Sequence, residues 1–252
     1  MNTHEQELKR LLTNQAYHPH KHLDVLERRK LLAQSYAETE NGIAVLSDFQ
    51  ENISYIYSGK FGEQIGLSKP FLQADSAFEE EVFSCIPPEE LLERHILELR
   101  FFHFQKALPV KERPCYNMVC PIHFSIPGKG DIPVLHRTYY LESLPEGSVW
   151  LGLCLYTPFI ETGSITGQIV NNRTGETVLP EMYVSFDKQL LSTREIEVLS
   201  LLAKGLSSKQ IADTLYISVH TVYRHRQNIL ETLQVNNTAA AVEIGIRLHL
   251  IP

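Results

Sequence analysis

The C-terminal quarter of the chain combines helical periodicity with an absence of proline, which sets it apart from everything before it. No proline occurs between Pro180 and Pro252. Apolar residues recur there at intervals of three and four, the spacing that places them on one face of a helix. The helical runs are short, and short helices are stable only when they pack together. Residues 187–252 are therefore predicted to form a separate all-α domain of four helices.

Capping residues mark where the first helices begin. Ser192 is followed three residues later by Glu195, and Ser207 is followed by Gln210. Both pairs fit the capping box, in which two side chains satisfy the free backbone N–H groups of a helix start. Gly205 supplies a left-handed end for the first helix. The second run is barely three turns long and leads through a tight turn into a third helix, so the pair is predicted to form a helix-turn-helix.

The chain as a whole is acidic, and its positive charge gathers in this segment. The net charge is −7, so the molecule has no general attraction to phosphate. Residues 187–252 carry seven Lys or Arg against six Asp or Glu, and residues 204–226 carry four against one. A polyanionic partner is therefore expected to bind a local surface here.

The third helix, over residues 219–233, has two different sides. At about 100° per residue, one apolar side is predicted to be buried and consists of Val219, Val222, Ile229 and Leu233. The opposite side consists of His220, Arg224, Gln227 and Glu231. In the major groove of DNA, arginine pairs bidentately with guanine and glutamine with adenine, each worth roughly 1–3 kcal/mol of discrimination. This face is therefore predicted to read base edges.

Arg226 lies only two residues from Arg224 but is predicted to do a different job. It falls about 40° from Val222, on the inner side of the helix. An inward arginine must find a partner for its charge, and Glu195 and Glu197 on the first helix are the available carboxylates. A structural ion pair between Arg226 and Glu195 is favoured over a phosphate contact. His225 is expected to be a packing histidine rather than a pH switch.

The stretch LSTREIEVLSLLAKGLSSKQIADTLYISVHTVYRHRQNILETLQV resembles the LuxR-type (GerE-like) helix-turn-helix in order and spacing, and the match extends over residues 191–242. The family pattern runs approximately L-T-x-R-E-x-E-V-L, G-x-S-N-K-E-I-A, L-x-I-S-x-x-T-V-x-x-H, then N-I and K-L-x-V. Tyr216 stands in the turn where many members carry glycine. The resemblance implies a DNA-binding module that is usually attached to a separate sensor or receiver domain.

The resemblance also assigns site residues by position. It implies base contacts from Tyr223, Arg224 and Gln227. It implies contacts to the DNA backbone from Ser207, Ser208, Lys209 and Thr221. It further implies that the fourth helix, with Ala239, Val242 and Ile246, helps to form a homodimer on double-stranded DNA.

Before residue 187 the periodicity is mostly that of strands. Two short strands are predicted near 42–49 and 52–57, a long helix near 88–108, and three antiparallel strands near 116–126, 132–143 and 148–157. Strands, a helix and strands again predict an α+β domain. By this order, residues 38–160 resemble a PAS domain that senses a signal or mediates dimerisation. Residues 1–37 are expected to be an N-terminal helical segment, and residues 161–186 a linker or hairpin.

The remaining cysteines, histidines and aromatic residues are considered as ligands of a metal or of a small molecule. The cysteines show no CxxC pair or zinc-ligand spacing, and Pro19 breaks the alignment of His18, His20 and His22, so neither a metal nor a cofactor is expected. A filled core is favoured over a ligand pocket for Met118, Cys120, His123, Trp150 and Cys154, although a small-molecule ligand in the PAS-like half stays an open alternative.

Enzymatic and membrane functions find little support in the sequence. There is no GxSxG, no HExxH and no dinucleotide fingerprint after a strand, and no stretch has the ~20 apolar residues of a membrane span. A cytoplasmic transcription regulator that is not an enzyme is therefore expected. The alternative is a protein-interaction or adaptor module whose basic helical bundle is incidental. DNA binding would weaken steeply as salt rises, whereas a mostly apolar protein interface would not.

Overall fold

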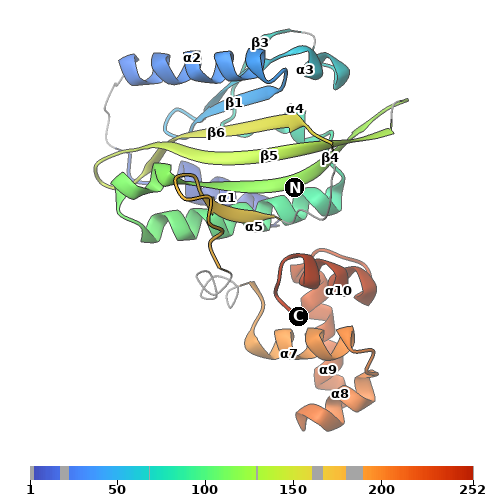
Figure 1. Ribbon diagram of the computed structural model, residues 1–252. Coiled ribbons are helices and arrows are strands. Elements are labelled where there is room, and N and C mark those ends of the chain that lie inside the picture. The colour runs from blue at the N-terminus through green and yellow to red at the C-terminus, as the bar shows by residue number, and fades with distance from the viewer. Residues whose placement is uncertain are drawn as a thin grey trace. The chain divides into compact units, whose positions relative to one another are not determined.

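The computed structural model describes residues 3–17, 23–67, 69–128, 130–160, 167–179 and 190–251. The chain divides into two compact units, Thr3–Val178 and Leu179–Pro252 (Figure 1). His18, His20 and His22 lie outside the described residues, and so does the prediction made for them. Within the described part of the chain, none of the helices combines the length and the apolar character of a membrane span.

The N-terminal unit is built on one antiparallel sheet of seven strands in the order β3-β2-β1-β6-β5-β4-β7. The strands are β1 (Ile43–Asp48), β2 (Ile53–Ser58), β3 (Phe71–Ala74), β4 (Tyr116–Ile126), β5 (Gly130–Ser143), β6 (Val149–Pro158) and β7 (Gln168–Asn171). The two strands and the three strands predicted from periodicity pair through β1 and β6, which lie side by side near the middle of the sheet. The α+β prediction is confirmed.

Helices cover both faces of this sheet. They are α1 (Thr3–Thr13), α2 (Leu23–Thr39), α3 (Lys60–Gln64), α4 (Glu80–Phe83), α5 (Pro88–Ala107) and the 3-10 helix η1 (Val110–Cys115). In Figure 1, α2 runs along one side of the sheet, and α1 and α5 lie together on the other. Ala33 and Ala37 of α2 pack on Leu153 and Leu155 of β6. Strand β6 is buried from Val149 to Tyr156, as its two apolar faces predict.

The sequence does not predict the two short strands at the edges of the sheet. Strands β3 and β7 have four residues each, too few to show a period of two. Of the two alternatives for 161–186, a linker or a hairpin, the described residues 167–179 form a hairpin, and its first strand, β7, also pairs with β4 as the edge strand of the sheet. A turn after β7 brings Thr177 back to Val170, and of this segment only residues 167–179 are described.

The C-terminal unit contains four helices: α7 (Thr193–Ala203), α8 (Ser208–Leu215), α9 (Val219–Thr232) and α10 (Thr238–Arg247). The first three pack on one another, and α10 packs on α7 and α9. The core of this unit consists of Leu191, Val198, Leu199, Ile211, Ala212, Val222, Ile229, Leu233, Ala241, Ile244, Leu248, Leu250 and Ile251, together with Leu190 at its edge. Each helix is followed by a residue with positive φ, namely Gly205, Tyr216, Gln234 and His249. A left-handed residue at this place lets the last carbonyls of a helix accept hydrogen bonds.

Candidate nucleic-acid interface

Two capping boxes fix the beginnings of α7 and α8. The hydroxyl of Ser192 accepts from the N–H of Glu195 while the Glu195 carboxylate accepts from the Ser192 N–H. Ser207 and Gln210 repeat this arrangement at α8. Partial burial acts against ionisation of Glu195, but the hydrogen bonds from Ser192 hold the pKa of that carboxyl below its ordinary value. Both predicted boxes are confirmed.

The turn between α8 and α9 is set by Tyr216 and Ser218. Tyr216 adopts φ of 53°, and the following N–H, of Ile217, donates to the Ala212 carbonyl at 3.0 Å. The ring of Tyr216 is 94% exposed, so no side-chain packing holds it there. Ser218 then caps α9, because its hydroxyl accepts from the Thr221 N–H at 3.0 Å. The arginine of α7, Arg194, donates to the Leu215 carbonyl at 2.6 Å and so ties α7 to this turn.

The outward face of α9 carries the three residues expected to contact bases. Tyr223, Arg224 and Gln227 are all exposed. The Gln227 amide donates to Glu231 one turn later at 2.9 Å, whereas the Arg224 guanidinium has no hydrogen bond or ion pair with the described residues. Val222, Ile229 and Leu233 are buried as predicted. Val219, expected among them, is exposed because it is the first residue of the helix, beyond the edge of the core.

Arg226 faces inward but does not pair with a carboxylate. Its guanidinium donates to the Ser208 hydroxyl at 2.7 Å and to the Thr238 hydroxyl at 2.8 Å. The predicted ion pair with Glu195 is therefore wrong. Glu195 is already engaged by its own helix cap and by the side-chain amide of Asn228 at 3.1 Å. Arg226 instead links the start of α8 to the start of α10.

The four residues expected at the DNA backbone have different surroundings. Lys209 is exposed at the start of α8, and Ser207 is exposed with its hydroxyl used in the cap. Thr221 is half-buried, with its hydroxyl 2.8 Å from that of Ser218. Ser208 is only 8% exposed and accepts from Arg226. The Ser208 hydroxyl is used inside the domain, so the predicted contact of Ser208 with the DNA backbone would have to come from its N–H group at the start of α8.

The helix α10 presents the residues expected at a dimer contact. Ala239 and Ile246 are exposed and Val242 is half-buried, whereas Ile244 on the opposite side is buried. A side chain at Gly245 would meet Leu199 at 2.9 Å, which explains the glycine where α10 packs on α7. The three residues therefore lie outside the core of their own domain.

Comparison with known protein families finds a match in the C-terminal unit. Residues 189–244 match the family model described as "Bacterial regulatory proteins, luxR family". The matched residues include all of α7, α8 and α9 and most of α10. The C-terminal domain is a LuxR-type helix-turn-helix domain.

Curated relatives match only part of the chain. The oxygen regulatory protein NreC of Staphylococcus aureus is 29% identical over 121 residues, 46% of this chain and 54% of that protein. NreC of Staphylococcus epidermidis is 34% identical over 88 residues, 34% of this chain and 40% of that protein. The alignments thus extend over about half the length of these relatives or less.

Two solved structures align along most of the chain but at low similarity. The Vibrio cholerae VqmA dimer aligns over 90% of this chain and 90% of its own, at 14% identity and a TM-score of 0.32. SdiA of Escherichia coli aligns over 98% of this chain and 97% of its own, at 14% identity and a TM-score of 0.28. Because this similarity is so low, the LuxR-type assignment is based on the family match alone.

Outside the LuxR-type domain, five residues were considered for a ligand pocket, and of these only Cys154 lines one of the hollows described below. Met118, Cys120, Trp150 and Cys154 are buried, and Trp150 packs with the leucines beneath α2. Cys154 points to the opposite face, where it contacts Arg94 of α5. His123 is half-buried and bound to Glu90, whose carboxylate accepts from the His123 N–H at 2.6 Å. A filled core therefore holds for Met118, Cys120 and Trp150.

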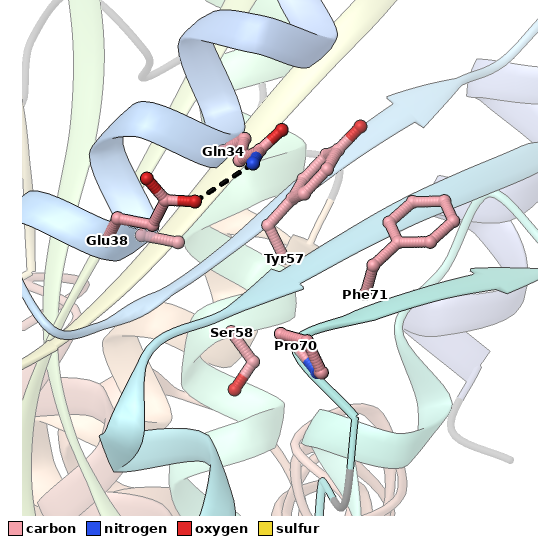
Figure 2. A pocket seen from close by; sticks show the side chains of 7 residues that line it. Gln34, Glu38, Tyr57, Ser58, Pro70 and Phe71 are labelled. Atoms are coloured by element: carbon pink, nitrogen blue, oxygen red, sulfur yellow. Dashed lines mark hydrogen bonds between the residues drawn. The ribbon is translucent and has the colours of Figure 1, made fainter.

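Two hollows of the N-terminal unit were not predicted. A surface pocket of about 430 Å³ lies between α2 and the strands β2 and β3, and Figure 2 shows Tyr57 and Phe71 beside the hydrogen-bonded pair Gln34 and Glu38. A buried hollow of about 10 Å³, lined by Glu79, Arg94 and Cys154 among others, lies between the sheet and α5. Their residues are scattered along the chain, so no local motif marks either one.

Proposed function

We propose that this protein is a transcription regulator that binds double-stranded DNA as a homodimer through its LuxR-type domain. The proposal places α9 in the major groove, with Tyr223, Arg224 and Gln227 at base edges. The observation that carries it is the outward face of α9, where an arginine without a described partner stands on a helix whose other side is buried.

Lys209, Ser207 and Thr221 are proposed to hold the DNA backbone. They lie at or near the starts of α8 and α9, where free N–H groups favour an anion. Ala239, Val242 and Ile246 of α10 are proposed as the dimer contact, since they lie outside the domain core. The PAS-like N-terminal unit would sense a signal or strengthen dimerisation, and such a regulator would act in the cytoplasm.

The test is selection of binding sites from a pool of random DNA duplexes by the full chain. We expect the wild type to enrich one sequence, with affinity that falls steeply as salt rises. Arg224→Ala should lose preference at one base pair, worth about 1–3 kcal/mol, and should keep its fold because Arg224 has no hydrogen bond or ion pair with the described residues. Lys209→Ala should weaken binding to all sequences alike.

Arg173→Ala is the matched control, because it also removes one exposed arginine but lies in the turn after β7. Unchanged affinity and unchanged preference in Arg224→Ala would contradict the assignment of Arg224. A wild type that enriches no sequence and binds with little dependence on salt would contradict DNA binding and favour the adaptor alternative.

A further inference from the structure

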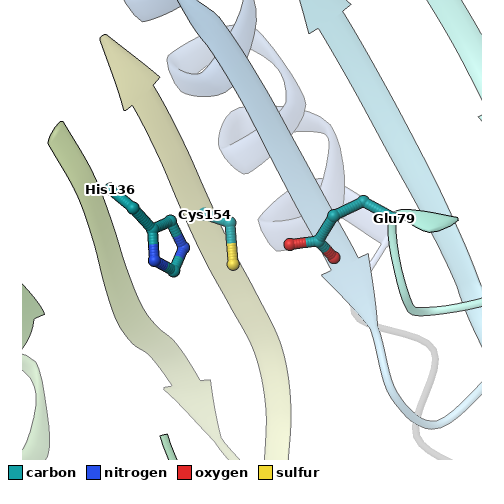
Figure 3. A group of neighbouring side chains, drawn as sticks. All are labelled: Glu79, His136 and Cys154. Atoms are coloured by element: carbon teal, nitrogen blue, oxygen red, sulfur yellow. The ribbon is translucent and has the colours of Figure 1, made fainter. Parts of the chain in front are cut away.

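Three potential metal ligands meet between the sheet and α5, in a chain whose sequence predicts no metal. They are Glu79, immediately before α4, His136 of β5 and Cys154 of β6, and one ligand atom of each lies within 4.8 Å of the others (Figure 3). All three side chains are buried. Strand register explains the pairing of two of them, because His136 and Cys154 are diagonal neighbours on adjacent strands and point to one face.

His136 has the state that a metal ligand needs. Its Nδ1 is buried and has no hydrogen-bond partner in the described part of the chain, while its Nε2 lies 3.1 Å from the Thr138 hydroxyl. Burial, with Arg94 nearby, lowers the pKa of His136 well below its ordinary value, so the ring is neutral. Metal ions bind the neutral imidazole, and ligating histidines usually hold a polar partner on the other nitrogen.

Glu79 is held in place through one oxygen. Its Oε1 accepts from the Tyr156 hydroxyl at 2.7 Å and from Arg94 at 3.2 Å. Both described side-chain contacts of the carboxylate go to this oxygen, which leaves Oε2 for a third partner. A carboxylate oriented by such outer contacts is typical of metal sites.

Cys154 is a free thiol with two weak polar neighbours. Its Sγ lies 3.7 Å from the Thr138 hydroxyl and 3.8 Å from Arg94 Nη2. Metal ions bind the thiolate and not the thiol. Binding a metal must therefore release its proton.

Charge balance allows a cation beside Arg94. Arg94 lies 3.2 Å from Glu79 and 3.1 Å from Glu98, so one buried cation faces two carboxylates. Above about pH 7, where Glu98 as well as Glu79 is ionised, the group carries one net negative charge. A divalent ion that displaces the Cys154 proton adds one net positive charge and leaves the buried cluster neutral, which avoids the large penalty for an isolated buried charge.

We propose that Glu79, His136 and Cys154 bind one divalent transition-metal ion of the zinc class in the N-terminal unit. A thiolate, an imidazole and a carboxylate suit zinc and disfavour magnesium and calcium. Three protein ligands leave a fourth position, and Glu79 and Cys154 also line a hollow of about 10 Å³, close to the smallest volume that holds one water molecule. In the binding step the S–H bond breaks, an S–metal bond forms, the proton passes to solvent, and no electron is transferred.

The experiment measures metal binding by the full chain directly. The metal-free protein is titrated with Co²⁺, which reports a thiolate ligand by a near-ultraviolet charge-transfer band and tetrahedral geometry by intense visible bands, and then with Zn²⁺ in competition. We expect one ion per chain and release of a single proton on Zn²⁺ binding. Cys154→Ser should abolish the charge-transfer band and weaken Zn²⁺ binding at least ~100-fold, more than the loss of an outer partner of a metal ligand usually causes.

Cys120→Ser is the matched control, since Cys120 and Cys154 are each 6% exposed and both lie on the sheet. His136→Gln is the second ligand variant, and the fluorescence of Trp150 shows whether each variant is folded. The proposal is overturned if the folded wild type gives no charge-transfer band, or if Cys154→Ser keeps the band, or if Cys120→Ser loses it equally. Metal binding is measured without DNA, so its outcome is independent of the proposed DNA binding.

Discussion

Two arginines separated by one residue differ because a helix turns about 100° per residue. Arg224 points away from the domain, and Arg226 points toward the starts of α8 and α10. The sequence predicts this difference in direction correctly. It does not predict the partners of Arg226, because Ser208 and Thr238 lie on two other helices and come near Arg226 only after packing. A buried cation is generally expected to pair with a carboxylate, and Glu195 would supply one. The Glu195 carboxylate already accepts a hydrogen bond from the Ser192 N–H in the cap of α7.

The position of Arg226 predicts an effect on stability. Arg226→Ala removes two charge-assisted hydrogen bonds that connect three helices, and it leaves the nearly buried Ser208 hydroxyl without that donor. Because the Arg226 side chain is only partly buried, we expect a loss of about 1–2 kcal/mol in the free energy of unfolding of the LuxR-type domain. Urea unfolding followed by far-ultraviolet circular dichroism measures it.

Arg224→Ala serves as the control for Arg226→Ala, since it removes the same side chain from the outward face of the same helix. We expect its unfolding curve to match that of the wild type. If Arg226→Ala unfolds like the wild type and binds DNA more weakly, Arg226 contacts phosphate instead.

At the scale of elements, the turn between α8 and α9 contains backbone strain at Tyr216. A residue with a side chain costs roughly 1–2 kcal/mol in the left-handed conformation, and Tyr216 adopts it with an almost fully exposed ring. Tyr216→Gly should therefore stabilise the domain by about 0.5–1 kcal/mol, the gain being limited by the greater freedom of glycine in the unfolded chain. Thermal unfolding of the domain measures the change.

Tyr216→Ala separates backbone strain from the loss of the ring. Alanine keeps the Cβ that clashes in the left-handed conformation, so we expect its stability to stay near that of the wild type or to fall. A Tyr216→Gly variant that is less stable than Tyr216→Ala would show that the backbone at Tyr216 is not strained.

Strands of six residues or more are predicted from the sequence, and strands of four residues are not. Strands β4 to β6 and helix α5 have ten residues or more, enough to show their period. The edge strands β3 and β7 and the five-residue α3 have too few residues to do so. The same limit applies to sites: the face of α9 is local and predictable, whereas Glu79, His136 and Cys154 meet only after the sheet has formed.

At the scale of the whole molecule, one buried carboxyl group makes the stability of the N-terminal unit depend on pH. Burial raises the pKa of Glu98 in α5 from 4.5 to about 7, although Arg94 favours its ionised form. The native state therefore holds a proton that the unfolded chain releases at lower pH. Glu98 should therefore contribute a loss of stability to the N-terminal unit that grows as pH rises from about 4.5 to about 7 and stays level above that range. The buried histidines His95 and His136 act in the opposite direction, so this contribution is read as the difference from a variant that lacks Glu98.

Glu98→Gln should remove this dependence and make the N-terminal unit more stable than the wild type above pH 7, by at most about 3 kcal/mol. The chain has a single tryptophan, Trp150, buried beneath α2, so its fluorescence in urea reports the N-terminal unit alone. Glu63→Gln, at an exposed position of α3, should leave the pH profile as in the wild type. A wild-type profile that rises from pH 5 to pH 7 relative to Glu98→Gln would contradict the raised pKa.

The caps of α7, α8 and α9 have a consequence for the thermodynamics of association. A capping side chain of the domain itself accepts from one N–H group in the first turn of each of these three helices, and left-handed residues close their ends. The helices are therefore formed before any partner arrives, and association need not supply the conformational entropy of ordering them. A surface built in this way gains affinity from rigidity, and its complexes should form with little added helicity and a heat-capacity change set by the contact area alone.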